Sequence, residues 1–216
     1  MSKLKTLQSV TLGALLVVPS VLTAQSFQAF LDSAQEVAPG GQTNSTGTGF
    51  GSLFLSGSEA EGFVLHYELV FDASVNFDNA FPGEGLDNGG SEIVRDDVVL
   101  HIHRGERGTN GPISLGIFGP DQDPEAQIVL NSDNTTTVFG SFDGGDPTNE
   151  SINDIAQDFL SVPQGADTEF YFNLHGENDP AGLIRGQITA VPEPSTYGLV
   201  GIGLLTAVVL LRRKKA

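Results

Sequence analysis

Two histidines stand two residues apart near the middle of the chain, in the run VVLHIHRGERGTNGP at residues 98–112. Residues at i and i+2 of a strand point to the same face, so the side chains of His101 and His103 are expected to share one. His175 ends another predicted strand and is the candidate for a third imidazole nearby. Three imidazoles that leave a coordination position open can bind zinc or copper. The first hypothesis is therefore a metal site at His101, His103 and His175.

The alternative is that these histidines belong to the β-scaffold and bind no metal. Each imidazole would then hydrogen-bond a backbone carbonyl or a neighbouring carboxylate, such as Asp96, Asp97 or Glu177. Other catalytic patterns are scarce, because the chain has no cysteine and no G-x-S-x-G nucleophile elbow. The sequence therefore favours a non-catalytic domain, with a metal-binding protein or metal-dependent enzyme as the alternative.

Three acidic loops carry a second set of candidate ligands. The runs DNGGSE, GPDQDPE and DGGDPTNE hold carboxylate and carbonyl oxygens of the kind that Ca²⁺ prefers. None of them has the spacing of an EF-hand loop. Such runs are commonly solvated turns, and a calcium site in one of them is the competing interpretation.

The chain is strongly acidic away from its two ends. Residues 6–190 contain four arginines, no lysine and 26 acidic residues. Nucleic-acid binding through a basic patch is excluded, because contact with the phosphate backbone requires cationic side chains. With so few cations, each arginine is expected to have an acidic partner. We expect Glu36 and Arg185 to form an ion pair that fastens the first strand of the domain to the last.

The middle of the chain has the pattern of an all-β domain. Short segments of alternating or continuous apolar residues are separated by clusters of Gly, Asn, Asp and Pro, which are typical of turns. In one segment Ile152, Ile155 and Phe159 recur every three or four residues, which predicts a short helix ended by Pro163. The predicted fold is a β-sandwich or barrel-like domain, immunoglobulin-like or superoxide-dismutase-like, of about eight strands with one helix. The predicted strands are residues 27–32, 49–57, 61–71, 98–104, 112–119, 135–142, 169–176 and 182–190.

Three motifs in register resemble the CHRD domain, a module first described in chordin. These motifs are SAQEV at 33–37, HIHRGERGTNGP at 101–112 and FYFNLHGENDPAGLIRGQI at 170–188. The resemblance covers roughly residues 26–190 and implies an all-β module without naming an activity. The chain departs from the family pattern at Leu183, where Glu is usual, and in an apparent insertion at residues 76–97. The HxH strand is also similar to that of copper–zinc superoxide dismutases, but those sites need more imidazoles than four histidines supply.

The N-terminus has the pattern of a secretory signal peptide. Lys3 and Lys5 precede a short apolar run, and small residues follow it, which predicts cleavage after Ala24. The run is too short for a transmembrane anchor and is interrupted by Pro19.

The C-terminus has three parts in a fixed order. A Pro-flanked acidic motif precedes an apolar segment at residues 197–211, predicted to be a transmembrane helix, and a basic end at residues 212–215. Positive charge stays on the cytoplasmic side, so the acidic domain is expected to lie outside the inner membrane. This order resembles the PEP-CTERM sorting signal of Gram-negative bacteria and implies recognition by an exosortase. The motif consists of Val191, Pro192, Glu193 and Pro194.

The sequence thus predicts a signal peptide at residues 1–24, a CHRD-type β domain at 25–190 and a sorting tail at 191–216. The expected protein is exported and non-catalytic, and resides in the cell envelope, on the outer surface or in the extracellular matrix. Its expected processing partners are signal peptidase and exosortase, with the inner membrane contacted transiently through the C-terminal helix. Exopolysaccharide or another surface protein is the expected binding partner. A permanent membrane anchor is the alternative fate of the tail.

Overall fold

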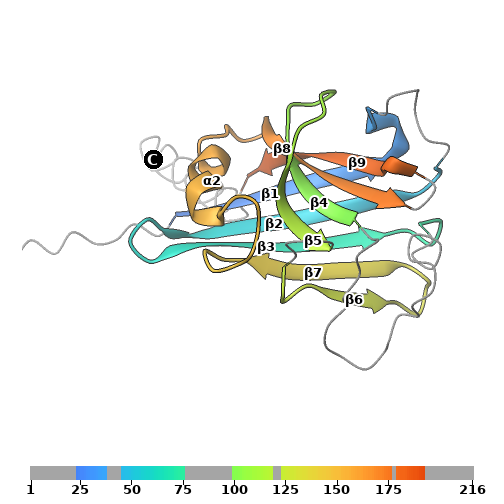
Figure 1. Ribbon diagram of the computed structural model, residues 1–216, viewed down its shortest axis with the longest axis horizontal. Helices are drawn as coiled ribbons and strands as arrows, with labels where there is room; N and C mark the ends of the chain where they lie inside the picture. The colour runs from blue at the N-terminus through green and yellow to red at the C-terminus, as the bar shows by residue number, and fades with distance from the viewer. Residues whose placement is uncertain (1–22, 38–44, 76–98, 119–122, 177–178, 193–216) are drawn as a thin grey trace, which may run out of the picture.

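The computed structural model describes residues 23–37, 45–75, 99–118, 123–176 and 179–192. Within these ranges nine strands form one antiparallel sheet that curls into a half-barrel (Figure 1). The strand order is β5-β4-β8-β9-β1-β2-β3-β7-β6. The prediction of an all-β domain with one short helix is confirmed. The elements are β1 (Thr23–Asp32), the 3-10 turn η1 (Ser33–Gln35), β2 (Thr48–Ser58), β3 (Gly62–Phe71), β4 (Val99–Arg104), β5 (Ile113–Phe118), β6 (Gln127–Leu130), β7 (Thr136–Phe142), α2 (Ile152–Leu160), β8 (Asp167–Gly176) and β9 (Asp179–Val191).

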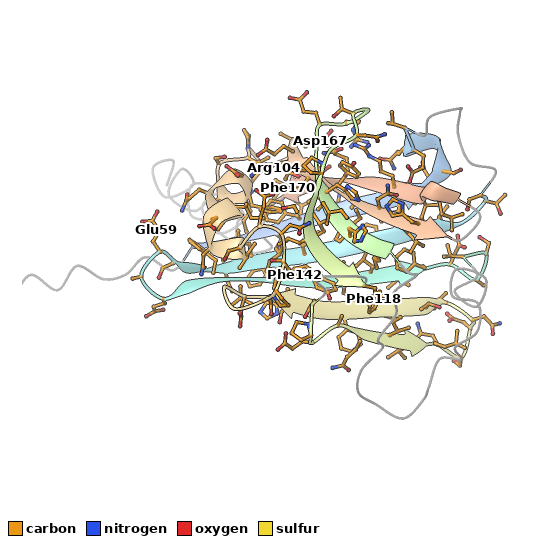
Figure 2. All side chains as sticks on the ribbon, viewed as in Figure 1. Glu59, Arg104, Phe118, Phe142, Asp167 and Phe170 are labelled. Atoms are coloured by element: carbon orange, nitrogen blue, oxygen red, sulfur yellow. The ribbon has the colours of Figure 1, made fainter. Side chains whose placement is uncertain are left out.

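The core fills the inner face of the curled sheet. Strand alternation sends every second side chain inward, as in β2, where Leu53 and Leu55 are buried while Ser52 and Phe54 are exposed. Phenylalanine supplies much of the buried volume, in agreement with a chain that has no tryptophan. Figure 2 labels three of these core rings, which come from β5, β7 and β8: Phe118, Phe142 and Phe170.

Helix α2 packs on the inner face of the sheet, as the apolar spacing predicts. Its N-cap is Ser151, whose hydroxyl accepts a hydrogen bond from the backbone N–H of Asn153. The Phe159 ring stacks on Phe170 at a centroid distance of 4.3 Å and meets Phe27 edge-on at 5.3 Å. The buried residues of the helix are Ile152, Ile155, Ala156 and Phe159.

An ion-pair cluster on the surface joins the helix to the sheet. The guanidinium of Arg104, at the end of β4, contacts the carboxylate of Asp158 in α2 and lies 3.3 Å from that of Glu169 in β8. It also lies 5.0 Å from the centroid of the Phe170 ring (Figure 2). These carboxylates are partly exposed, so each pair adds little stability by itself.

The sequence prediction missed one strand. β6 has four residues, pairs with β7 at the edge of the sheet, and leaves Val129 and Leu130 exposed. Because an edge strand of this length buries so little, its sequence shows no alternation that would distinguish it from a loop.

Candidate metal centre

The three histidines named by the sequence come together on the outer face of the sheet. In the pairing of β4 with β8, His101 lies opposite Asn173 and His103 opposite Tyr171, so that His175 is the diagonal neighbour of His101. One ring nitrogen from each histidine lies within 4.8 Å of the other two. The ring centroids are 5.4–5.7 Å apart. The structure therefore assembles the predicted donor set, whereas metal binding itself stays a prediction.

The local strand geometry helps to orient this pair. Ile102 between the two histidines is fully buried in the core, which sends both imidazoles to the opposite face, as the i, i+2 spacing predicts. The register between β4 and β5 shifts immediately before His101 and again before His103. Such irregularities re-aim side chains and are common beside functional sites.

The imidazoles of β4 are buried, and burial keeps them neutral. His101 is 2% exposed and His103 is 9% exposed. Burial lowers the pKa of His101 to about 3, and the neighbouring imidazoles of His175 and His103 lower it further. Burial also lowers the pKa of His103, although its hydrogen bond to Gly111 partly opposes this shift. Neutral imidazole is the form that binds a metal ion.

Hydrogen bonding fixes the tautomer of His103. Its Nδ1 lies 3.0 Å from the carbonyl oxygen of Gly111. A carbonyl only accepts, so Nδ1 carries the proton and Nε2 presents a lone pair. In the described part of the chain, neither Nε2 of His103 nor Nδ1 of His101 has a hydrogen-bond partner, although both atoms are buried. A histidine whose second ring nitrogen donates to a carbonyl is the usual arrangement of a metal ligand.

The loop between β4 and β5, residues 105–112, covers the outer face beside the histidines. The backbone N–H of Gly111 donates to the hydroxyl of Tyr171, 3.2 Å away, and the Tyr171 ring stacks on His103 at 5.1 Å. The side-chain amide of Gln187 in β9 donates to the carbonyl of Gly105 at 3.1 Å. These contacts hold the loop as a lid of fixed structure, which explains why imidazoles on an outer face are buried.

Arg185 is the centre of this polar layer. It is 1% exposed, and its guanidinium donates to the carbonyls of Thr109 at 2.8 Å and Glu106 at 3.1 Å. It also lies 3.4 Å from the centroid of the Tyr171 ring. Burial lowers the pKa of Arg185, while Tyr171 and Glu36 favour its charged form. The loop carbonyls are thus the main hydrogen-bond acceptors of the guanidinium. Sequence reasoning did not predict that Arg185 would hold this loop.

The predicted partner of Arg185, Glu36, lies against the same strand. Glu36 is buried, and a Cβ at Gly182 of β9 would lie 2.4 Å from its Oε2. Gly182 also has φ +133°, a conformation that other residues rarely adopt. The first and last motifs of the domain therefore meet here. A direct ion pair between Glu36 and Arg185 stays a prediction.

Asn173 is a further residue that sequence reasoning missed. It lies opposite His101 on one side and opposite Arg185 on the other. Its side chain is 4% exposed, and its Oδ1 has no hydrogen-bond partner in the described part of the chain. The sequence did contain a signal for Asn173. It alternates with core residues in step with Tyr171 and His175, which places it on the same face as the histidines. An amide oxygen at this place can accept a hydrogen bond from a metal-bound water.

A second cluster of donors joins two of the three acidic loops. Carboxylate oxygens of Asp123, Glu125 and Asp146 lie within 4.8 Å of one another. Asp123 is buried and accepts hydrogen bonds from the Tyr67 hydroxyl at 2.6 Å and the backbone N–H of Ser141 at 3.1 Å. These partners account for the position of Asp123 without an ion, and calcium binding stays a prediction.

Asp123 also ties together the two sides of the half-barrel. Its backbone N–H donates to Gly116 in β5 at 2.8 Å, while its carboxylate accepts from Tyr67 in β3 and Ser141 in β7. β5 and β6 are the two edges of the sheet, and β7 and β3 lie next to β6. The residue therefore bridges strands that the sheet order separates.

We expect this carboxylate to make the stability of the domain fall between about pH 4 and pH 6. Burial raises the pKa of Asp123 to about 6, so the folded state binds more protons than the unfolded state in that interval. Stability must then decrease as the pH rises through it, by roughly 1–3 kcal/mol in all. Asp123→Asn should abolish this part of the pH dependence, measured as the free energy of unfolding in urea at pH 4, 5, 6 and 7. Unchanged pH dependence in the variant would contradict the assignment, and the exposed Asp133→Asn serves as the control.

Several other sequence predictions fall outside the described residues. These include the scaffold partners proposed for the histidines and the loop DNGGSE. The signal peptide up to residue 22, the rest of the sorting motif after Pro192 and the C-terminal apolar segment lie there as well. Among the residues that the structure does describe, no helix has the length and apolar character needed to cross a membrane.

Comparison with family models gives two matches. The CHRD domain model matches residues 27–188, and the PEP-CTERM protein-sorting motif matches residues 190–214. No curated protein and no solved structure matches the chain. The sorting motif implies export to the envelope of a Gram-negative bacterium and processing by an exosortase. The CHRD match spans three quarters of the chain and contains all three of the clustered histidines. The chain therefore belongs to the CHRD domain family.

Proposed function

We propose that this exported protein acts in the cell envelope or its matrix as a binding module, and that its CHRD domain holds one zinc or copper ion. The ligands are His101, His103 and His175. The observation that carries the proposal is the meeting of three imidazole nitrogens within 4.8 Å of one another on β4 and β8. Two of these histidines are buried and have lowered pKa values, so they are neutral and able to bind a metal at the pH of the envelope.

The donor set selects the kind of metal. Imidazole suits zinc and copper, whereas calcium and magnesium prefer oxygen ligands. Nitrogens bound to one tetrahedral zinc lie about 3.4 Å apart, given a Zn–N distance of about 2.0–2.1 Å. The present separation of up to 4.8 Å would have to shrink by about 1.4 Å at most. Small rotations of the side chains can supply this change.

The surroundings favour a stabilising ion within a binding module over a catalytic one. The ion would join β4 to β8 directly, and through the Gly111 contact it would also hold the covering loop. A buried site behind such a loop leaves little room for a substrate. A metal-dependent enzyme is the alternative, and it requires a substrate to reach the open coordination position. Exopolysaccharide or a surface protein remains the proposed partner of the module.

Metal analysis tests the proposal directly. The full-length protein, purified without a histidine tag and equilibrated with Zn²⁺ or Cu²⁺, should retain one ion per chain after gel filtration. His101→Ala and His103→Ala should lose it, because two remaining imidazoles make a weak site. His66→Ala is the matched control, since His66 is an exposed histidine of β3 in the same sheet and should leave the metal content unchanged.

Two results would contradict the metal site. One is a folded wild-type protein that retains neither ion. The other is a metal content that falls equally in the His66 variant, which would indicate binding at the surface. Circular dichroism of each variant separates loss of the site from loss of the fold.

We also propose that signal peptidase cleaves after Ala24 and that exosortase removes the tail, so that the inner membrane is contacted only transiently. The match to the sorting motif at residues 190–214 supports the exosortase step. Mass spectrometry of the protein from the producing cells should show both ends removed. An intact C-terminus would instead identify the tail as a permanent anchor.

A further inference from the structure

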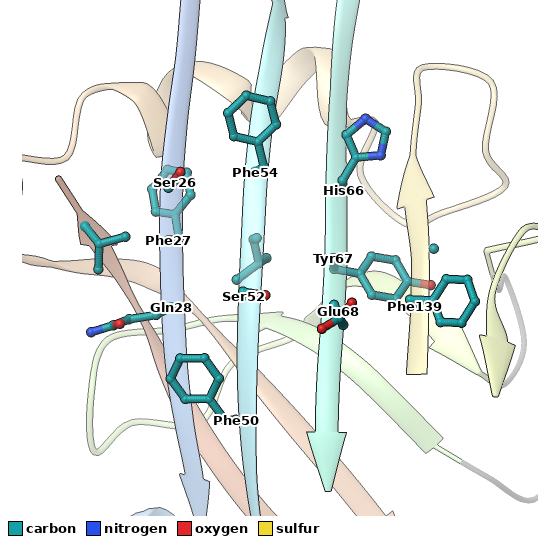
Figure 3. Close-up of a pocket in the computed structure, with 13 residues that line it drawn as sticks. Ser26, Phe27, Gln28, Phe50, Ser52, Phe54, His66, Tyr67, Glu68 and Phe139 are labelled. Atoms are coloured by element: carbon teal, nitrogen blue, oxygen red, sulfur yellow. The ribbon is translucent and has the colours of Figure 1, made fainter. Parts of the chain in front are cut away.

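Three exposed phenylalanines lie on the outer face of β1 and β2, away from the cluster of His101, His103 and His175. Phe30 is 55% exposed, Phe50 is 48% exposed and Phe54 is 41% exposed. They occupy outward positions of the strand alternation, and Phe30 lies directly opposite Phe50 in the β1–β2 pairing. In Figure 3 the rings of Phe50 and Phe54 lie on the near side of the sheet and turn their flat faces toward the viewer. Large apolar side chains that are exposed together, rather than singly, mark an interaction site or a ligand-binding groove.

Two of the rings, Phe50 and Phe54, line a shallow hollow of about 530 Å³ that extends over β1, β2 and β3. Polar side chains stand between the rings: Ser52 separates Phe50 from Phe54 on β2, and Gln28 lies beside them on β1. Glu68 of β3 completes the polar set (Figure 3). The centre of this surface therefore mixes ring faces with hydroxyl, amide and carboxylate groups.

The charge of the surface restricts its partner. Among the described residues that line the hollow, Glu68 is the only acidic or basic one apart from a histidine. The domain around it carries 26 acidic residues against four arginines. An anionic polymer or an anionic lipid surface would be repelled by that field, and no cation in the hollow would bind it. The charge distribution thus argues against an anionic ligand.

The mixture of groups restricts the partner further. The centre of a protein–protein interface is usually apolar, with polar groups at its rim. Here the polar groups stand at the centre, between the rings. A sugar ring has an apolar face that packs on an aromatic ring and an edge of hydroxyls that hydrogen-bond amide, hydroxyl and carboxylate groups. Flat exposed rings with polar groups between them match both features.

We propose that this face binds a neutral polysaccharide chain lying along β2. Phe50 and Phe54 are four residues apart, which is about 13 Å along a strand. One polysaccharide chain of several sugar units is long enough to contact both rings. Gln28, Ser52 and Glu68 would hydrogen-bond the sugar hydroxyls. This inference locates the polysaccharide partner named in the proposed function, and it does not depend on the metal site, which lies on other strands of the sheet.

Affinity electrophoresis of the purified full-length protein tests the inference. Native gels would contain one of three neutral polysaccharides (hydroxyethyl cellulose, dextran or galactomannan) or the anionic alginate. At least one neutral polymer should retard the wild-type protein, and alginate should not. Phe50→Ala and Phe54→Ala should each weaken the retardation about tenfold. Phe50→Tyr keeps the ring and should bind like the wild type, while Leu130→Ala removes an exposed apolar side chain elsewhere and should have no effect.

The results that would overturn the polysaccharide inference differ from those that would contradict the metal site. Retardation by none of the three neutral polymers, or equal retardation of the wild-type and Phe50→Ala proteins, would overturn the inference. Binding to phosphatidylcholine vesicles, or self-association in gel filtration, that is lost in Phe50→Ala while no glycan binds would assign the face to another partner. Metal content measured on the same samples should be unchanged in the phenylalanine variants, so that each proposal stands or fails separately.

Discussion

Replacing Arg185 by methionine is expected to lower the free energy of unfolding by roughly 2–5 kcal/mol. Methionine keeps most of the apolar stem but provides no donor, so the carbonyls of Thr109 and Glu106 would lose hydrogen bonds now 2.8 and 3.1 Å long. The contact of the guanidinium with the Tyr171 ring would also be lost. Chemical denaturation at pH 7, followed by circular dichroism, measures the change.

Arg107→Met provides the matched control. Arg107 lies on the same loop and pairs with Asp167, but its side chain is 53% exposed. Exposed ion pairs contribute about 1 kcal/mol or less, so this variant should unfold almost like the wild type. Equal losses in the two variants would contradict the central role of Arg185. Arg185→Lys should recover only part of the loss, because an ammonium group cannot reproduce the planar set of donors.

A double-mutant cycle with Glu36→Gln would test the predicted ion pair within the same experiment. If Glu36 and Arg185 interact directly, their combined loss should be smaller than the sum of the single losses by more than about 0.5 kcal/mol. Additive losses would mean that Glu36 is held by other contacts. Coupling is the expected result, because the charge of Glu36 favours the charged form of Arg185 and opposes the lowering of its pKa by burial.

The local elements could be predicted because their causes are local. Strand alternation places residues such as Leu53 and Phe54 on opposite faces, and the spacing of Ile152, Ile155 and Phe159 requires a helix to share one face. The assembly of these strands into one curled sheet is a different matter. It depends on pairings such as β3 with β7, which join segments about 70 residues apart and leave no trace in either segment alone.

In the candidate site, too, some features follow from the local sequence and others depend on the folded chain. The common face of His101 and His103 follows from their spacing, and the alternation in β8 places His175 on the matching face. Their burial could not be predicted, since it comes from the covering loop. Arg185 holds that loop through residues 76 to 79 positions away in sequence. Polar contacts of this range depend on the folded topology rather than on a motif.

The acidic loops show a related difficulty. GPDQDPE has the composition of a solvated turn, yet Asp123 within it is buried and bonded to Tyr67 from another strand. Burial of a carboxylate requires hydrogen-bond partners, and these become visible only in the folded chain. The composition of a loop therefore indicates its average exposure. It does not identify a single buried residue such as Asp123, whose hydrogen bonds join the loop to other strands.

Gly111→Ala is expected to lower the free energy of unfolding by about 3 kcal/mol. A Cβ at this position would lie 1.6 Å from the carbonyl oxygen of Arg104, so the backbone of β4 or of the loop must move. Backbone atoms cannot turn aside as the end of a flexible side chain can. Gly145→Ala is the control, because its Cβ would meet only the Asp143 side chain, at 3.1 Å. Denaturation of both variants at pH 7 gives the comparison.

Gly111→Ala should also weaken metal binding in the fraction of the protein that stays folded. The carbonyl of Gly111 holds the proton on Nδ1 of His103 and thereby directs Nε2 toward the other imidazoles. Displacing that carbonyl should reduce zinc affinity about 10–100-fold, the usual effect of losing a residue that orients a metal ligand. Competition with a chromogenic chelator on the folded variant at low temperature measures this change. A destabilised variant with unchanged zinc affinity would show that the loop only covers the histidines. A parallel loss of affinity would show that the loop selects the ring nitrogen that binds the metal.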